Sequence, residues 1–236
     1  MIKTSKILCA ALVALQLVPS GAGAFTYQLD NGSISTILNA SEGTESLDNW
    51  FGNVFTVTGG PNQITAVDFG VYTTTPGSVG SVSLYLVTGA GGNPALGASR
   101  LFTQAFTPLA GDGTNAFLQQ ITLTTPVSFN LGDKFLVGVM IRNVTGAPPN
   151  DVYPFLLDTS GSAAGTFWDR SAPNTFDVDN LTGAVPINQA LTPGGFVPGA
   201  GHVFIRAEAT VVPEPAALAL SGIGLAAGMM IKRRSR

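Results

Sequence analysis

The end of the chain limits what can fold as a globular domain. Pro213-Glu214-Pro215 cannot continue a strand or a helix, because each proline fixes φ and lacks a backbone N–H. Residues 216–231 contain no charged side chain, and the basic tail 232–236 contains Lys232, Arg233, Arg234 and Arg236. An uncharged run followed by Lys and Arg predicts a membrane-spanning helix whose basic end stays in the cytoplasm. The alternative, a buried helix of a soluble domain, is disfavoured because the run is glycine-rich and apolar on every face.

The stretch 211–236 resembles the C-terminal sorting signal of the PEP-CTERM family. The matching residues are Pro213-Glu214-Pro215, the Ala-Leu-Ala-Leu run at 217–220, Gly222, Gly224 and the basic cluster 232–234. The resemblance implies export in a Gram-negative bacterium that makes exopolysaccharide, with a transient anchor in the inner membrane. It also implies a partner, an exosortase, which is a membrane transpeptidase-like enzyme that recognises the motif and removes the tail. The resemblance predicts a destination and assigns no activity.

The beginning of the chain predicts a cleaved signal peptide at residues 1–24. Lys3 and Lys6 form a positive n-region, and residues 7–18 form an apolar h-region. Ala22-Gly23-Ala24 supplies the small-residue cleavage pattern, so we expect cleavage before Phe25. The Sec translocon and signal peptidase are the partners that this segment implies. Cys9 is the only cysteine and is removed with the signal peptide, so the mature chain has neither a disulfide nor a thiolate.

Residues 25–210 are predicted to form one extracellular domain. With the export segments set aside, this part contains five Lys and Arg residues and thirteen Asp and Glu residues, a net charge of −8. A surface of that sign argues against nucleic acid or anionic lipid as a partner. Low charge density with abundant Gly, Thr, Ser and Asn favours an all-β domain.

Short alternating segments separated by turn residues support that fold class. The expected strands are 25–29, 33–38, 54–57, 64–72, 79–87, 101–107, 117–124, 134–142, 152–157, 165–168 and 202–211. Asn31-Gly32 is a hairpin signal between the first two. The strand 134–142 is apolar on both faces and is therefore expected at the centre of a sheet. We predict a β-sandwich of Greek-key or jelly-roll type, loosely similar to exported bacterial jelly-roll domains, in which the Pro- and Gly-rich stretch 169–200 is a functional or mobile loop.

The sequence contains few residues or motifs that would support catalysis. His202 is the single histidine, and no G-x-S-x-G elbow presents a serine to it, so we interpret it as a half-exposed residue at the start of a strand. Zinc sites built from His and Cys are excluded, and the glycines are interpreted as turn residues rather than phosphate-binding loops. A pair of carboxylates could hydrolyse sugars, and the acids in loops are candidates for it (Asp151, Asp158, Asp169, Asp177, Asp179).

Two further groups could bind a ligand. Asp177, Asp179 and Asn180 gather oxygen donors of the kind that Ca²⁺ prefers, although Asx turns explain them equally well. Trp50 and Trp168 lie beside polar residues and could stack on sugar rings, with burial in the core as the alternative. Apart from this Ca²⁺, no cofactor is expected.

These observations predict a non-catalytic surface or extracellular-matrix protein, sorted by an exosortase and associated with exopolysaccharide or biofilm. A carbohydrate-binding module that uses Trp50 and Trp168 is the alternative. A polysaccharide-cleaving enzyme is the third hypothesis, because a β-sandwich alone does not determine function.

Overall fold

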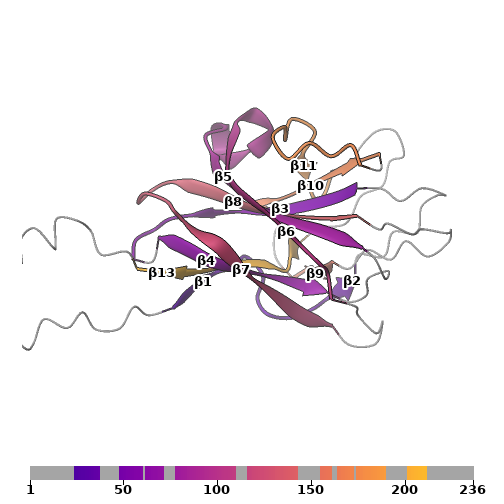
Figure 1. Ribbon diagram of the computed structural model, residues 1–236, viewed down its shortest axis with the longest axis horizontal. Helices are drawn as coiled ribbons and strands as arrows, with labels where there is room; N and C mark the ends of the chain where they lie inside the picture. Colours follow the sequence, from indigo (N-terminus) through magenta and orange to yellow (C-terminus); the bar gives the residue numbers. More distant parts are fainter. Residues whose placement is uncertain are drawn as a thin grey trace, which may run out of the picture.

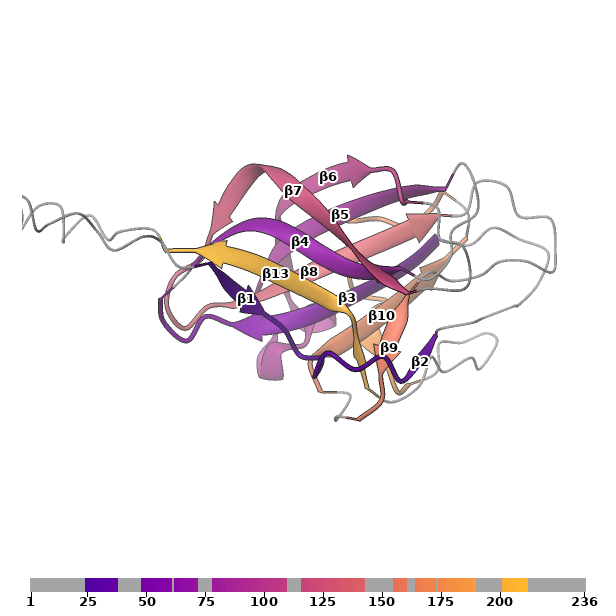
Figure 2. The ribbon, with the colours of Figure 1, turned by 90° about the horizontal axis from the view of Figure 1, so that it is seen from below.

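The computed structural model is an all-β domain whose two main sheets face each other (Figures 1 and 2). It describes residues 24–37, 48–60, 62–71, 78–109, 116–142, 155–160, 164–172, 174–189 and 201–211. Among these residues no helix is long and apolar enough to span a membrane. The predicted signal peptide up to residue 23 and the predicted sorting signal beyond residue 211 lie outside the described residues.

Most strands overlap the predicted segments, but β3 begins six residues earlier than expected and β11 lies in a stretch predicted to be a loop. They are β1 (Phe25–Tyr27), β2 (Thr36–Ile37), β3 (Asp48–Thr56), β4 (Gln63–Val71), β5 (Val79–Val87), β6 (Ala98–Phe106), β7 (Phe117–Ser128), β8 (Lys134–Arg142), β9 (Leu156–Asp158), β10 (Thr166–Ser171), β11 (Val185–Pro186), β12 (His202–Val203) and β13 (Ile205–Thr210). Two short 3₁₀ turns, η1 (Ala90–Gly92) and η2 (Pro94–Leu96), connect β5 to β6. The all-β prediction is confirmed.

The strands form a sandwich. A six-stranded sheet has the order β11-β10-β3-β8-β5-β6, a four-stranded sheet has the order β1-β13-β4-β7, and a small sheet has the order β12-β9-β2. The long strands alternate between the sheets except at the β5–β6 hairpin, since β3, β5, β6 and β8 belong to the larger sheet and β4 and β7 to the smaller one. This alternation places the apolar side chains of both sheets in a common core. The finer jelly-roll assignment stays a prediction.

The central position of β8 is confirmed. It pairs with β3 on one side and β5 on the other, and every residue from Phe135 to Ile141 is buried. Phe135, Val137 and Val139 point into the core between the sheets, whereas Leu136 and Met140 point to the outer face of the six-stranded sheet. A strand that is covered on both faces needs apolar residues at successive positions, because these point to opposite faces.

The outer face of the six-stranded sheet is covered by residues 174–189. Leu181, Ala184 and the partly buried Phe176 of this segment pack on Trp50 and Tyr85 of the sheet in a second apolar cluster. This part of the 169–200 stretch is thus a packed cover held against the sheet, and whether it has a function stays a prediction. Residues 173 and 190–200 lie outside the described residues.

The Asn31-Gly32 hairpin is also wrong. Gly32 has the positive φ of +86° that the motif favours, but β1 pairs with β13 and β2 pairs with β9. The turn redirects the chain from one sheet to another because each strand finds a better partner far away in the sequence.

Both ends of the domain lie at one end of the sandwich. β1 and β13 are antiparallel neighbours, with Phe25 opposite Ala209, so the first strand begins where the last strand ends (Figure 2). The backbone N–H of Asn62 donates to the carbonyl of Thr210 at 3.1 Å and orders the last residue of β13. The segments that precede residue 24 and follow residue 211 thus connect to neighbouring points.

Glutamine side chains join the free edges of the two sheets. The Gln104 amide, from β6, donates to the carbonyl of Thr122 at 3.1 Å and accepts from the N–H of Thr124 at 2.8 Å, both in β7. The Gln119 amide, from β7, in turn donates to the carbonyl of Thr107 and accepts from the N–H of Leu109. Each amide takes the place of a neighbouring strand, which reduces the number of unpaired groups at the edge.

Candidate functional site at the junction of the chain ends

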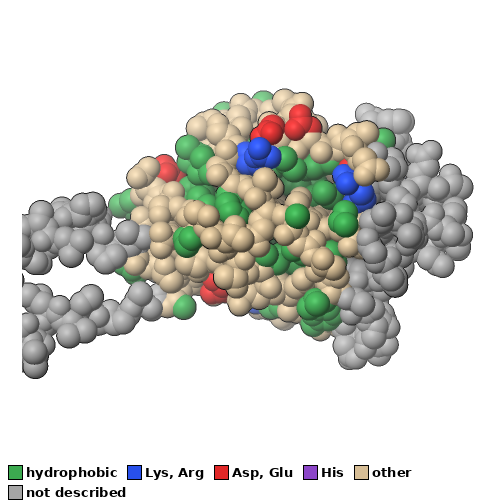
Figure 3. Space-filling model, viewed as in Figure 1, with side chains coloured by type: hydrophobic (Ala, Val, Ile, Leu, Met, Phe, Trp, Pro, Cys, Tyr) green, Lys and Arg blue, Asp and Glu red, His purple; other side chains and the backbone are tan. Residues whose placement is uncertain are grey.

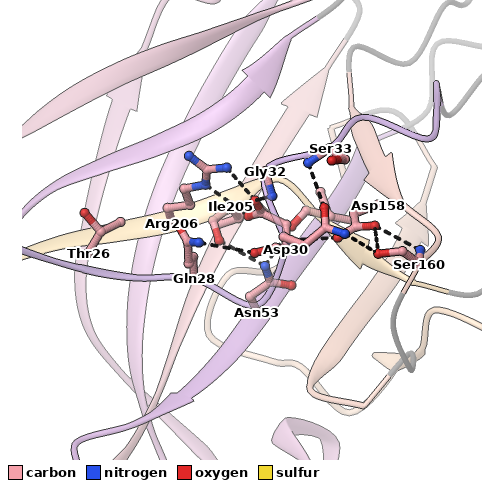
Figure 4. Close-up of polar contacts among 12 residues, drawn as sticks. Thr26, Gln28, Asp30, Gly32, Ser33, Asn53, Asp158, Ser160, Ile205 and Arg206 are labelled. Atoms are coloured by element: carbon pink, nitrogen blue, oxygen red, sulfur yellow. Dashed lines mark hydrogen bonds and ion pairs between the residues drawn. The ribbon is translucent and has the colours of Figure 1, made fainter.

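Polar side chains connect the N-terminal segment to the last strands, at the junction drawn in Figure 4. We call residues 25–33 the N-terminal segment. Its strand β1 adds to the edge of β13, where Tyr27 is buried in the core and the Thr26 hydroxyl donates to a Glu208 carboxylate oxygen at 2.8 Å. The segment therefore completes the four-stranded sheet beside the point where the chain leaves the domain.

Asp30 and Arg206 form a bidentate ion pair at this junction. The guanidinium binds both carboxylate oxygens, with Arg206 Nε 3.0 Å from Asp30 Oδ2 and Nη2 bonded to Oδ1. The Asp30 side chain is fully buried and the Arg206 side chain is 16% exposed. The hydrogen bond to Asp30 raises the pKa of Arg206, and the guanidinium also lies 5.5 Å over the Phe204 ring. A bidentate pair with so little solvent is geometrically selective.

Asp158 holds the next residue of the N-terminal segment. Its Oδ2 accepts from the backbone N–H of Asn31 at 2.7 Å, and its Oδ1 accepts from the backbone N–H and the hydroxyl of Ser160. Burial alone would raise the pKa of Asp158, but these hydrogen bonds and the nearby His202 outweigh it, so the pKa is lowered. The Asn31 amide also donates to the Ser160 hydroxyl at 2.5 Å. The Asp158 carboxylate therefore binds the N-terminal segment through Asn31.

A buried chain of hydrogen bonds continues from this point across the sandwich. The Asn53 amide nitrogen donates to the carbonyls of Val203 and Ile205, which leaves its oxygen to accept from the Thr166 hydroxyl at 2.8 Å. His202 Nδ1 lies 2.9 Å from the same hydroxyl oxygen. Because the hydroxyl proton is used toward Asn53, Nδ1 must carry the imidazole proton and donate it. This series of hydrogen bonds fixes the tautomer of His202.

His202 is not the half-exposed residue that we expected. It is 8% exposed, and burial lowers its pKa even though Asp158 and Asp30 act in the opposite direction. Thr166, its hydroxyl partner, is completely buried and donates to an amide oxygen. A catalytic hydroxyl must be accessible to substrate, and a neighbouring base must accept its proton. The Thr166 hydroxyl meets neither requirement. Its geometry supports a structural role.

The two tryptophans do not offer a surface for sugar stacking, and that prediction is corrected. Both are 1% exposed. The Trp50 ring stacks on Phe176 with centroids 6.0 Å apart and lies over Gly138, where an added Cβ would come within 2.8 Å of the indole carbons. Trp168 packs in the inner core and donates its indole N–H to the carbonyl of Gln189 at 3.0 Å. Both rings are core aromatics, the alternative considered above.

The predicted Ca²⁺ ligands are used in local turns. Asp177 accepts from the N–H of Asp179 at 2.9 Å, and Asn180 accepts from the N–H and hydroxyl of Thr182. Asp179 also pairs with Arg100 at 3.1 Å. Within the described part of the chain no three His, Cys, Asp or Glu side chains are grouped in a way that could hold a metal ion. Calcium binding by these residues stays an untested prediction.

The described acids among those considered for sugar hydrolysis each contact another part of the fold. Asp158 is engaged with Asn31 and Ser160, and Asp169 is a buried residue of β10 whose pKa is raised by burial and lowered in part by the N–H of Arg170. Asp177 and Asp179 lie in the exposed turns described above. Asp151 lies outside the described residues.

Sequence reasoning missed a pair of neighbouring acids on the solvent-facing side of the four-stranded sheet. Asp68 of β4 faces Arg206 in the register of β13, and Glu208 is its diagonal neighbour. Burial raises the pKa of Asp68, and Glu208 raises it further against the opposing effects of Gln120 and Arg206. The alternation of β4 and β13 indicated which side chains point outward, but the register that joins them is not visible in the sequence.

Charged side chains are sparse on the face drawn in Figure 3, where basic and acidic groups are scattered among polar and apolar atoms. That face offers no continuous basic surface of the kind that binds nucleic acid.

Comparison with known proteins identifies the tail. Residues 211–234 match the model of the PEP-CTERM protein-sorting motif, so the chain carries the sorting signal of an exosortase substrate. The predicted resemblance is confirmed for this segment. No curated protein matches the chain.

Two solved structures align with this chain, and only the first reaches a TM-score of 0.50. A clostridial cysteine protease, Cwp84 after propeptide cleavage, aligns with a TM-score of 0.50 at 14% identity over 80% of this chain and 40% of that chain. Infectious bursal disease virus (Gt strain) aligns with a TM-score of 0.24 at 11% identity over 83% of this chain and 35% of that chain. The chain therefore spans less than half of the protease chain, and at this identity the likeness concerns the fold alone.

Proposed function

We propose that this protein is a non-catalytic surface or extracellular-matrix protein that is exported, sorted by an exosortase and associated with exopolysaccharide or biofilm. The observation that carries the proposal is the PEP-CTERM motif, which begins directly after β13. β13 pairs with β1, and β1 begins at the predicted signal cleavage site. The two export segments thus connect to adjacent strands of one folded domain.

This arrangement supports a defined route. The Sec translocon and signal peptidase process residues 1–24, the run 216–231 holds the chain in the inner membrane, and the exosortase then acts at Pro213-Glu214-Pro215. From Thr210 to Ala216, where that run begins, the chain can extend by only about 20 Å. The folded domain therefore stays close to the membrane until the tail is removed, with the opposite end of the sandwich directed away.

A role without catalysis is supported by how the polar groups are used. His202 donates to a buried threonine, Asp158 and Asp30 bind the N-terminal segment, and Asp48 binds Arg142. Each of these groups satisfies another part of the fold. The proposed function requires no cofactor.

The sorting step is tested in the producing bacterium with Pro213, Glu214 and Pro215 all replaced by alanine. We expect the variant to keep its tail, remain in the membrane fraction and be lost from the cell surface. Ser221→Ala, within the apolar run and outside the motif, is the matched control and should be processed normally. Normal processing of the triple variant would contradict the proposal.

The matrix association is tested with mature protein taken from the cell surface. Exopolysaccharide from the producer is incubated with it, with and without Ca²⁺, and both retention and new sugar ends are measured. We expect the protein to be retained on the exopolysaccharide without new sugar ends. Binding through a carbohydrate-binding surface other than the tryptophans would give the same result. Release of new reducing or unsaturated ends would instead establish an enzyme.

A further inference from the structure

The N-terminal segment is held by residues that are made much later in the chain. Thr26 bonds Glu208, which is 182 residues away, and Asp30 bonds Arg206, 176 residues away. Asn31 bonds Asp158 across 127 residues. Until these partners have been exported, the segment has none of these bonds.

The predicted cleavage bond joins Ala24 to Phe25, the first residue of β1. Proteins that bind an extended peptide commonly do so by adding it as a strand, through the backbone N–H and C=O groups. In the folded domain residues 25–27 are paired with residues 207–209 of β13. The same backbone cannot be in this ladder and extended in a peptidase cleft at once, so cleavage and pairing exclude each other.

The chain order separates the two events in time. At a synthesis rate of roughly 5–20 residues per second, the interval between Thr26 and Glu208 lasts roughly ten to forty seconds. Once β13 is present, strand pairing takes microseconds to seconds. The peptidase therefore has a long period in which residues 25–27 are unpaired, and that period ends when β13 arrives.

We propose that the N-terminal segment acts as a latch that times signal-peptide removal. While the latch is open, the peptide bond between Ala24 and Phe25 is hydrolysed with one water, leaving a carboxylate on Ala24 and an amine on Phe25. Arrival of β13 then closes the latch through strand pairing and the Asp30–Arg206 and Asn31–Asp158 contacts. A precursor that folds first is protected from the peptidase. This inference rests on the export step of the proposed function.

Full-length protein provides the test. It is synthesised in a cell-free system, and purified signal peptidase in detergent is added either during synthesis or after synthesis and folding. We expect cleavage at Phe25 during synthesis and at least tenfold slower cleavage once the wild-type precursor has folded. Equal rates at the two times would overturn the inference.

Two arginine variants separate the latch from general unfolding. Arg206→Ala removes the partner of Asp30 and should restore cleavage after folding. Arg142→Ala, the matched control, removes the arginine of a second bidentate pair, which binds Asp48 instead of the N-terminal segment. It should stay protected, and equal restoration in both variants would show general unfolding and contradict the latch.

A milder variant keeps the test decisive if Arg206→Ala does not fold. Thr26→Val removes one hydrogen bond to Glu208 and leaves every charge in place. Its cleavage after folding should lie between that of the wild type and that of an unfolded precursor, and a rate equal to wild type would count against the latch. Absence of cleavage at Phe25 even during synthesis would contradict the export step itself, which distinguishes that failure from failure of the latch.

Discussion

Asp48 and Arg142 face each other across β3 and β8, with Arg142 Nε 2.5 Å from Asp48 Oδ1 and Nη2 2.8 Å from Oδ2. The same carboxylate accepts from the backbone N–H groups of Thr175 and Phe176, at 3.1 Å each. One buried acid therefore ties the six-stranded sheet to the cover over its outer face. Burial works against ionisation of Asp48, but these bonds prevail and lower its pKa.

Arg142→Ala should reduce the free energy of unfolding by about 3 kcal/mol, because it leaves a buried carboxylate without its partner. Denaturant unfolding monitored by tryptophan fluorescence measures the loss. Since Asp48 also fixes residues 175 and 176, hydrogen exchange in the cover should rise in the variant. A loss below about 0.5 kcal/mol would show that the pair is solvated like a surface salt bridge.

Asp68→Asn should stabilise the domain at neutral pH by about 0.2–1 kcal/mol, the scale of cross-strand charge pairs. Burial and Glu208 raise the pKa of Asp68 in the folded state, so its ionised form opposes folding above that pKa. The cost disappears as the pH falls through the folded pKa toward the unfolded value. Unfolding of both proteins at pH 7 and pH 4 should show the difference shrinking in acid, and a destabilised variant at pH 7 would contradict this assignment.

Gly138→Ala should cost about 1–3 kcal/mol, because the new methyl group would meet the Trp50 indole that lies on the glycine. Thermal unfolding of the single variant measures this cost. In a Trp50→Leu background the same substitution should cost clearly less, since the smaller side chain leaves room. Additive effects in this double-mutant cycle would contradict the packing described here.

Gln104→Ala should promote self-association. Removing the amide leaves the Thr122 carbonyl and the Thr124 N–H at the edge of β7 without their side-chain partner, and an exposed edge can pair with a second chain. Sedimentation velocity over a range of concentrations should show a dimer that the wild type lacks. Thr103→Ala, on the neighbouring residue of β6, is the control and should remain like the wild type.

Local pattern was sufficient for most strands and for the central position of β8. It failed in β3, where only residues 54–57 were expected, because Asp48, Asn49 and Asn53 interrupt the apolar pattern. All three are buried. The partner of Asp48 lies 94 residues away, and the backbone groups that Asn53 bonds lie 150 and 152 residues away. Polar residues with such distant partners look like loop residues in the sequence.

The same dependence on partners that are distant in the sequence explains why the prediction for the tryptophans was wrong. Trp50 and Trp168 are flanked by acids and amides, which suggested exposed rings, but β3 and β10 pair directly and place Phe51 opposite Trp168 in the core. Whether a ring is covered depends on what packs over it. For Trp50 that cover comes from Phe176, in a stretch whose Pro and Gly content indicated a loop.

The position of β13 determines how the domain responds to force at its C-terminal end. β13 lies between β1 and β4 and is hydrogen-bonded to both. When the opposite end of the sandwich is held, a pull at Thr210 acts along the strand and loads the hydrogen bonds on its two sides together. Such shear resists tension far better than unzipping from an edge strand. The domain would therefore resist unfolding when it is pulled from its C-terminal end.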